Sequence, residues 1–314
     1  MKIKKPKFWD YKKPNIYAYL LLPIAFILKT LIFLKKKPQK NKLNIKTICV
    51  GNIYLGGTGK TSLSIMINEI LKKNDIKTCF IKKLYKNQND EVKLLKNKGN
   101  LFLAPKRIDA VKKAELEGYE VAIFDDGLQD NSIKYDLSLI CFNDINWKGN
   151  GLTIPAGPLR EDINSIKKYN HIFLNGNLEN LENLEKEILK INSTIIIHKG
   201  EYEPINLDEF DKNDNYLIFS GIGNHQTFIA MLKKYGFNIF KDLEFPDHYN
   251  YTAKDLENIL NQADNLNCKV ITTEKDYFRI ENMNLDKIKF IKSKLKIIDE
   301  NKLIKILLKK NEIN

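Results

Sequence analysis

The residues best suited to chemistry lie in a glycine-rich loop that ends in a lysine and a threonine. Residues 51–61 read Gly-Asn-Ile-Tyr-Leu-Gly-Gly-Thr-Gly-Lys-Thr, after an apolar run at 48–50 and before a helical pattern at 62–73. Such a loop leaves backbone N–H groups pointing inward, and the following helix adds partial positive charge, so a polyphosphate fits there. Lys60 would reach the β- and γ-phosphates, and Thr61 would offer its hydroxyl to Mg²⁺. The residues expected at the nucleotide are Gly56, Gly57, Thr58, Gly59, Lys60 and Thr61.

The match to the strict phosphate-loop pattern G-x-x-x-x-G-K-[ST] is partial at its first position. Tyr54 stands there instead of glycine, whereas the core of residues 56–61 is intact. The alternative is an ordinary glycine-rich connection between a strand and a helix. Because a strand-like run precedes the loop and a helical pattern follows it, the context favours a phosphate loop.

A pair of carboxylates supplies a second candidate site. The apolar run of residues 121–124 ends in Asp125 and Asp126, which places hard oxygen ligands where a neighbouring phosphate-loop strand would present its phosphates. The two acids could instead form a turn before Gly127. Together with the upstream loop, however, they favour a metal site.

Alternating strand-like and helix-like segments must position these residues. Strands are expected at 46–50, 78–81, 121–124, 137–142 and 171–174, and helices at 60–73, 107–117 and 177–192. After a polar, turn-rich junction at 201–215, strands are expected at 216–219, 269–272 and 288–292, and helices at 226–235, 253–263 and 300–310. This alternation predicts an α/β fold with a parallel sheet covered by helices on both faces. We expect a phosphate-loop domain over residues 41–205 and a smaller α/β domain over 206–314.

The N-terminal segment is apolar and basic. Of the net charge of +13, twelve units lie in residues 1–46, so the remaining chain is close to neutral and nucleic acid is not an expected partner. The apolar run of residues 16–34 would reach about 28 Å as a helix, which is marginal for spanning a bilayer. Lysines on both flanks suit a helix lying at an anionic lipid surface at least as well. A buried core helix is a further alternative, and no cleavage site of a signal peptide follows. We expect residues 1–40 to attach the protein to a membrane.

The four cysteines and four histidines show no spacing of a zinc or redox motif. Cys49, Cys79 and Cys141 lie in strand-like apolar runs, and Cys268 just precedes one. This usage is typical of reduced thiols in a cytosolic protein.

Leu55 argues against one class of phosphate-loop protein. Membrane-associated ATPases of the cell-division and plasmid-partition type carry a lysine just before Gly-Gly, where this chain has Leu55. A phosphate-loop ATPase or GTPase that drives a partner protein remains an alternative to a kinase. A nucleotide-binding membrane scaffold without catalysis is another.

Further short motifs follow one another between residues 8 and 280. They are Gly51-Asn52, Asn89-Asp90-Glu91, Lys106-Arg107, Asp125-Asp126-Gly127-Leu128-Gln129, Pro155-Ala156-Gly157-Pro158-Leu159-Arg160-Glu161, Phe219-Ser220-Gly221-Ile222-Gly223, Pro246-Asp247-His248 and Thr272-Thr273-Glu274-Lys275-Asp276. In this order, with the apolar N-terminal helix and the glycine-rich loop, the chain resembles the tetraacyldisaccharide 4'-kinase family, the lipid A 4'-kinases of Gram-negative bacteria.

The resemblance implies transfer of the γ-phosphoryl group of ATP, with Mg²⁺, to the 4'-hydroxyl of a tetraacylated disaccharide 1-phosphate. It also implies attachment at the cytosolic face of the inner membrane, because an acceptor with four acyl chains stays in the lipid. By similarity, Asp90 is the base and His248 its orienting partner. The implied site comprises Asp90, His248 and Lys60 as catalytic residues, Arg107 beside the nucleotide, and Thr61, Asp125, Asp126 and Glu161 at the metal. The oligomeric state is not fixed by any of these features.

The chain departs from the family's pattern in three places, one of which is the short segment between Tyr85 and Asp90. The family's Ser-Arg-Gly-Tyr after the second strand reads Lys82-Lys83-Leu84-Tyr85 here, and lysine cannot bind in the bidentate manner of arginine. Asp130 stands where the family usually has histidine. These departures bear on contacts to the edge of the nucleotide and on the rate rather than on the type of reaction.

Overall fold

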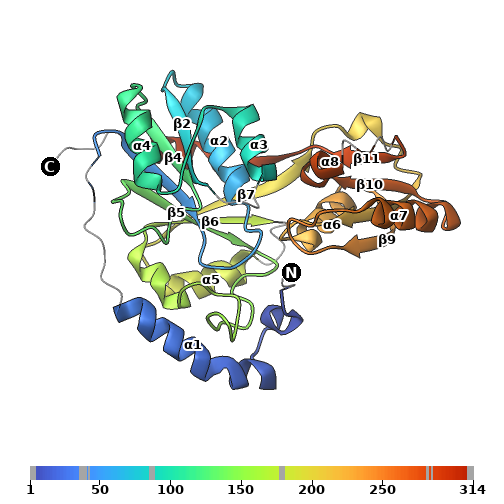
Figure 1. The fold of residues 1–314 in the computed structure, drawn as a ribbon, viewed down its shortest axis with the longest axis horizontal. Helices are drawn as coiled ribbons and strands as arrows, with labels where there is room; N and C mark the ends of the chain where they lie inside the picture. The colour runs from blue at the N-terminus through green and yellow to red at the C-terminus, as the bar shows by residue number, and fades with distance from the viewer. Residues whose placement is uncertain are drawn as a thin grey trace.

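The computed structural model describes residues 5–34, 41, 43–84, 89–176, 181–280, 283 and 286–309, with the backbone alone for residues 33, 89 and 90. Two β-sheets organise these residues into a large unit and a small unit that lie side by side (Figure 1). The expected α/β fold with a mostly parallel sheet is confirmed.

The large unit is built on an eight-stranded sheet. In spatial order its strands are β12 (Ser293–Ile297), β7 (Ile196–Pro204), β6 (His171–Gly176), β5 (Leu137–Asn143), β1 (Lys46–Gly51), β4 (Val121–Asp125), β2 (Thr78–Lys83) and β3 (Leu101–Ala104). All neighbouring pairs are parallel except β12 with β7. The central strands are almost wholly buried because helices cover both faces of the sheet.

Each face of the large sheet packs against its own set of helices. One face is covered by α4 (Arg107–Leu116), α5 (Leu181–Ile191) and the short helix η2 (Ile163–Lys168). The other is covered by α2 (Lys60–Lys72), α3 (Asn89–Lys98) and α9 (Glu300–Leu308). The carboxyl ends of β1, β2 and β4 therefore meet at one edge, from which loops lead to α2 and α3.

The small unit holds a four-stranded parallel sheet. Its strands, in spatial order, are β11 (Ile288–Ile291), β10 (Lys269–Thr273), β8 (Asn215–Ser220) and β9 (Asn238–Glu244). Helix α6 (His225–Lys234) packs on one face, whereas α7 (Ala253–Asn265) and α8 (Glu274–Ile280) pack on the other.

The strand pairing differs from the expected division into one domain over residues 41–205 and another over residues 206–314. The expected strand at 288–292 is followed directly by β12, which leaves the small unit and pairs antiparallel with β7 of the large sheet. Helix α9 then packs against α2. Asn206 lies where the chain leaves the large unit, and it bonds to the segment by which the chain returns. Its side chain donates to the Phe290 carbonyl and accepts from the Lys292 N–H. The small unit is thus an insertion into the large one.

The sequence did not predict β3, β7, β9, β12, α3 or α8. Strands β9 and β12 alternate exposed and partly or fully buried residues and carry lysines, so they lack the continuous apolar run of the central strands. Residues 201–204, expected to be part of a junction, complete β7.

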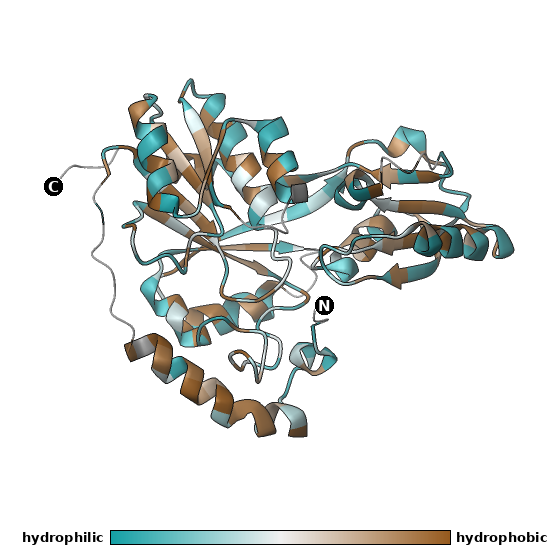
Figure 2. Cartoon of the chain, viewed as in Figure 1, coloured by the Kyte–Doolittle hydropathy of each residue, from teal (hydrophilic) through white to brown (hydrophobic). Residues whose placement is uncertain are grey.

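Helix α1 (Ile16–Leu34) runs along the outside of the large unit, below α5 (Figure 1). Most of its residues are hydrophobic, with a few hydrophilic ones between them (Figure 2). Phe26 and Leu20 are about 70% exposed, whereas Ala18 and Ala25 are buried. No described helix has both the length and the apolar character needed to cross a membrane. Residues 1–4 and 35–40, which belong to the segment expected to attach the protein to a membrane, lie outside the described part of the chain.

A short helix, η1 (Lys7–Asp10), ties the start of the chain to the large unit. The Trp9 indole donates to the Pro155 carbonyl, and the Tyr54 hydroxyl donates to the Asp10 carboxylate at 2.6 Å. Tyr54, which replaces the first glycine of the phosphate-loop pattern, is fully buried beneath this segment. Its ring therefore fills space under the N-terminal segment.

Candidate functional site

The glycine-rich loop connects β1 to α2 in a conformation that requires glycine. Gly59 caps α2 with φ near +75°, and Gly56 has φ near +145°, both in the region that side chains disfavour. Asn52 holds the loop from inside, because its amide donates to the Gly56 carbonyl at 3.2 Å and to the Thr58 hydroxyl at 2.7 Å. Hydrogen bonds from Asn52 therefore hold the loop in a curved conformation of the kind that binds phosphate.

A chain of buried amides links this loop to the small unit. Asn175, at the end of β6, donates to the Thr58 carbonyl at 2.6 Å and receives a bond from Asn143 at 3.3 Å. Asn143 also donates to the Thr227 hydroxyl of α6 at 2.9 Å. Hydrogen bonds thus connect helix α6 of the small unit to the glycine-rich loop through Asn143 and Asn175.

The two units touch directly at a pair of glycines. A Cβ atom on Gly57 would lie 2.9 Å from the Cα atom of Gly223, so neither position has room for a side chain. The glycine turn after β8 therefore packs against the phosphate loop.

The acidic pair lies beside the phosphate loop. Strands β1 and β4 are neighbours with Val50 opposite Asp125, and the Thr61 hydroxyl donates to Asp125 Oδ2 at 3.3 Å. Asp125 is 1% exposed, and its Oδ1 atom has no hydrogen-bond partner among the described residues. The expected neighbourhood of Thr61 and Asp125 is therefore present.

Asp126 is surrounded by cations. Its carboxylate lies 2.8 Å from Arg160 and 3.9 Å from the Lys60 ammonium. Burial alone would raise the pKa of Asp126, but Lys60 and Arg160 outweigh it and lower that pKa to about 2. Arg107 donates to the Asp126 backbone carbonyl at 2.5 Å and lies 3.6 Å from Asp130. Lys60 and Arg107, both predicted at the nucleotide, thus converge on Asp126.

Glu161 reaches the site through a glutamine. The Gln129 amide donates to the Asn52 carbonyl at 3.0 Å and to Glu161 Oε1 at 3.3 Å, and Arg160 donates to Gln129 Oε1 at 3.0 Å. Glu161 therefore stands near the loop but makes no direct contact with Thr61 or Asp125 in these interactions.

The small unit contributes His248 to the site, where it faces Glu91 of the large unit. His248 has φ near +56°, and its Nε2 atom lies 3.8 Å from Glu91 Oε1 on α3. Arg279 approaches His248 Nδ1 at 3.4 Å and donates to Asp276 at 2.7 Å. Lys275 also lies 3.9 Å from Glu91. The two units therefore meet across the site at Glu91.

Asp90, the predicted base, is the second residue of α3 and directly precedes Glu91. Its side chain lies outside the described part of the structure, so its expected pairing with His248 stays a prediction.

Sequence reasoning missed four residues that shape the site. Lys82, Glu91 and Arg160 form its ion pairs, and Asn175 supports the loop. Glu91 directly follows Asp90 and Arg160 directly precedes Glu161, so their position beside predicted site residues is a signal in the sequence. Lys82 and Asn175 follow apolar runs, where the carboxyl end of a parallel strand predicts site residues.

The donor set at the site fits Mg²⁺. The described residues contain no cluster of three or more His, Cys, Asp or Glu side chains able to hold a metal. Magnesium, however, commonly takes only one or two protein carboxylates and completes its shell with phosphate oxygens and water. The Thr61 hydroxyl and the unpartnered Asp125 Oδ1 atom are hard oxygen donors of this kind.

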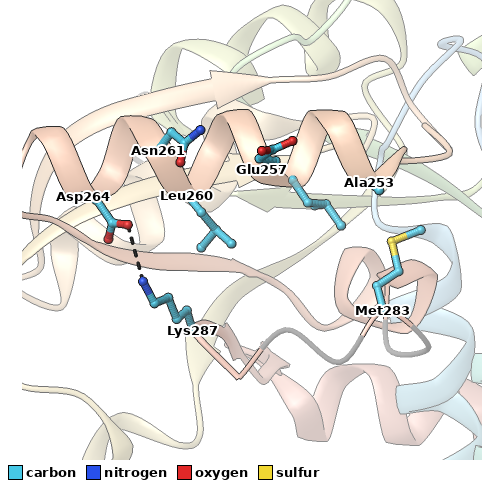
Figure 3. Close-up of a pocket in the computed structure, with 8 residues that line it drawn as sticks. Ala253, Glu257, Leu260, Asn261, Asp264, Met283 and Lys287 are labelled. Atoms are coloured by element: carbon cyan, nitrogen blue, oxygen red, sulfur yellow. Dashed lines mark hydrogen bonds and ion pairs between the residues drawn. The ribbon is translucent and has the colours of Figure 1, made fainter.

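A pocket of about 390 Å³ lies elsewhere, against α7 of the small unit (Figure 3). Leu260, Glu257 and Met283 are among the residues that line it, and Lys287 pairs with Asp264 across one end at 3.4 Å. None of the predicted site residues lines this pocket.

Known proteins resemble the chain over almost its whole length. The sequence profile of the LpxK family, described as tetraacyldisaccharide-1-P 4'-kinase, matches residues 17–312. The chain belongs to this family. A tetraacyldisaccharide 4'-kinase of Pelagibacter ubique strain HTCC1062 is 58% identical over 314 residues, covering all of both chains. One from Rickettsia canadensis strain McKiel is 34% identical, covering 100% of this chain and 99% of the relative.

The fold has a solved counterpart in the same family. A crystal structure of the "apo" form of LpxK from Aquifex aeolicus in complex with ATP superposes with a TM-score of 0.67. It covers 93% of this chain and 98% of that chain, at 23% identity. This match supports the arrangement of the two units described above.

Proposed function

We propose that the protein is an ATP-dependent tetraacyldisaccharide 4'-kinase that phosphorylates the 4'-hydroxyl of an acylated disaccharide 1-phosphate in lipid A biosynthesis. Membership of the family gives the reaction. The observation that carries the proposal in this chain is the contact between Thr61 and Asp125, which puts the phosphate loop and the acidic pair on one site.

The large unit would bind the nucleotide. The N–H groups of residues 56–61 would hold the phosphates of ATP, and Lys60 would leave its long contact with Asp126 to reach the β- and γ-phosphates. Thr61 and Asp125 would hold Mg²⁺, with Asp126 and Glu161 acting directly or through water. The metal would neutralise the phosphate charge that develops during transfer. Arg160 and Arg107 add positive charge around Asp126.

The acceptor would enter between the two units. The oxygen of the 4'-hydroxyl would bond to the γ-phosphorus, the bond from that phosphorus to the bridging oxygen would break, and ADP would leave. Asp90 would accept the hydroxyl proton, with His248 orienting it from the small unit. The position of Asp90 at the start of α3, one residue from the Glu91–His248 contact, supports this assignment.

Helix α1 would attach the protein to the cytosolic face of the inner membrane. Its exposed apolar side chains are costly in water and favourable in lipid, and the segment before it is basic. A lipid with four acyl chains cannot diffuse through water, so the kinase must meet it at the membrane.

The test of the reaction uses the full chain with ATP, Mg²⁺ and a tetraacylated disaccharide 1-phosphate. We expect a mass gain of one phosphate on the lipid and an equal amount of ADP. Turnover of ATP that does not depend on the lipid would indicate a hydrolase instead. Nucleotide binding without either product would indicate a scaffold.

The test of the membrane attachment uses flotation with anionic vesicles. The triple variant Leu20→Gln, Phe26→Gln, Ile27→Gln should lose most of its binding, because these side chains are exposed on α1. Leu116→Gln, at an 87% exposed position on α4, is the matched control and should float like the wild type. Equal flotation of all three proteins would contradict the attachment through α1.

A further inference from the structure

Lys82 is a buried cation that bridges two carboxylates at the site. It lies near the end of β2 and is 1% exposed. Its ammonium lies 2.5 Å from Asp125 Oδ2 and 2.7 Å from Glu91 Oε2. One lysine therefore joins a strand of the large sheet to the first turn of α3.

The charges around Lys82 explain why it remains an ammonium. Burial alone would lower the pKa of Lys82, but Asp125 and Glu91 outweigh it and raise that pKa. The two carboxylates and one ammonium leave a net negative charge, which Lys275 and His248 of the small unit face from the other side of Glu91. Glu91 is thus held between the two units, with Lys82 as its contact to the large one.

The bridge also sets the direction of Asp125. Lys82 and Thr61 both bond to Oδ2, so Oδ1 is the oxygen left without a described partner. A rotated carboxylate would exchange these roles. The Lys82 bridge therefore fixes which oxygen of Asp125 is open to a ligand.

We propose that Lys82 is a positioning residue for phosphoryl transfer: it clamps the first turn of α3, and with it Asp90, to the acidic end of β4. This inference rests on the proposed function for its kinetic consequence. Without the ammonium, the like charges of Asp125 and Glu91 would have no cation between them. The start of α3 would move away from the phosphate loop. A displacement of about 1 Å at a reacting group costs on the order of 10²-fold in rate.

The kinetic test compares Lys82→Gln and Lys82→Arg with the wild type. Lys82→Gln should lower kcat by about 10²-fold while the KM for ATP changes less than about threefold, because the phosphate loop itself is intact. Lys82→Arg keeps the positive charge and should recover at least about a tenth of wild-type kcat. Lys96→Met, on the exposed side of α3, is the matched control and should keep wild-type kcat.

A stability control separates positioning from general loosening. Ile259→Ala removes buried volume from α7 in the small unit and should lower Tm without a comparable loss of kcat. If kcat falls equally in Ile259→Ala and Lys82→Gln at matched Tm, the positioning role is overturned. A folded Lys82→Gln protein with near wild-type kcat overturns it as well.

Hydrogen exchange tests the clamp without any turnover. The amides of residues 91–98 should exchange faster in Lys82→Gln than in the wild type, whereas those of α7 should not change. If Lys82→Gln does not fold, Glu91→Ala removes the acceptor of the same bridge and leaves Lys82 paired with Asp125. It should show the same faster exchange in α3, and unchanged exchange would overturn the proposal.

The same measurement keeps the two proposals apart. A wild-type protein that transfers no phosphate to the acylated disaccharide would refute the proposed function. The exchange of α3 in the variants would still decide whether Lys82 holds that helix.

Discussion

Two polar clusters on the large sheet differ in charge: one contains an ion pair, and the other is a neutral pair of histidines. At the carboxyl ends of β2 and β4, Lys82 and Asp125 are buried and form an ion pair. Towards the other end of the sheet, His171 Nδ1 and His198 Nε2 lie 3.3 Å apart on β6 and β7. Burial, followed by His171 and Lys302, lowers the pKa of His198 to about 4, so this pair stays neutral at physiological pH.

The difference lies in whether a buried group has an opposite charge beside it. A buried group keeps its charge where an opposite charge is within hydrogen-bond distance, and loses it where burial is not offset by such a partner. The ionised cluster faces the phosphate loop, where charge is needed for binding. The effect of the neutral pair on stability depends on pH.

The largest expected effect is on catalysis at the ionised cluster. Lys60→Met should lower kcat/KM for ATP by about 10²–10³-fold, because the phosphates lose a fixed positive charge. Lys73→Met, just beyond the end of the same helix, is the control and should retain wild-type kinetics. Steady-state ADP release with the lipid acceptor measures both, and similar values for the two variants would contradict the assignment of Lys60.

Stability should respond next most strongly to breaking the buried pair. Asp125→Asn removes the charge opposite Lys82 and should lower the free energy of unfolding by about 3–5 kcal/mol. Urea denaturation at pH 7.5 measures this change. A loss below about 1 kcal/mol would mean that Glu91 alone compensates Lys82.

The neutral pair should make stability depend on pH. The unfolded chain binds a proton at His198 below about pH 6.5, but the folded protein does so only near pH 4. The unfolded state therefore binds more protons in this window, and stability falls by up to about 3 kcal/mol as the pH drops from 6.5 to 4. His198→Leu should flatten this part of the profile in urea denaturation. Parallel profiles for both proteins would show that His198 binds protons equally in the folded and the unfolded state, which would contradict the lowered pKa.

The smallest effect is expected for an exposed ion pair. Lys269 contacts Asp214 on the surface of the small unit, and the lysine side chain is 64% exposed. Lys269→Met should change the free energy of unfolding by less than about 1 kcal/mol, since water screens the pair. A change as large as that of Asp125→Asn would remove the distinction between buried and exposed charge.

Sequence predicted the ionised cluster much better than the neutral one. The phosphate loop and the acidic pair are local patterns, each defined by a few consecutive residues after an apolar strand. His171 and His198 are 27 residues apart, and only the register of β6 on β7 brings them together. The bridge from Lys82 to Glu91 likewise depends on how α3 folds back on β2, which no spacing encodes.

The same reasoning explains what was predicted of the fold. The central strands and α2 were evident because burial on both faces produces continuous apolar runs. The short strand β12 reads Ser-Lys-Leu-Lys-Ile, an alternation that suits an edge as well as a loop. Its partner, β7, lies almost ninety residues earlier in the chain, so local pattern could not assign it to the large sheet.

The return of β12 and α9 to the large unit has a consequence for biosynthesis. A ribosome releases the amino-terminal end first, and the phosphate loop emerges early. The helix that follows this loop, α2, is covered in part by Leu303 and Leu307. Residues 215–291 can complete their own sheet before those leucines are translated. The nucleotide-binding half is thus the first to be started and the last to be finished.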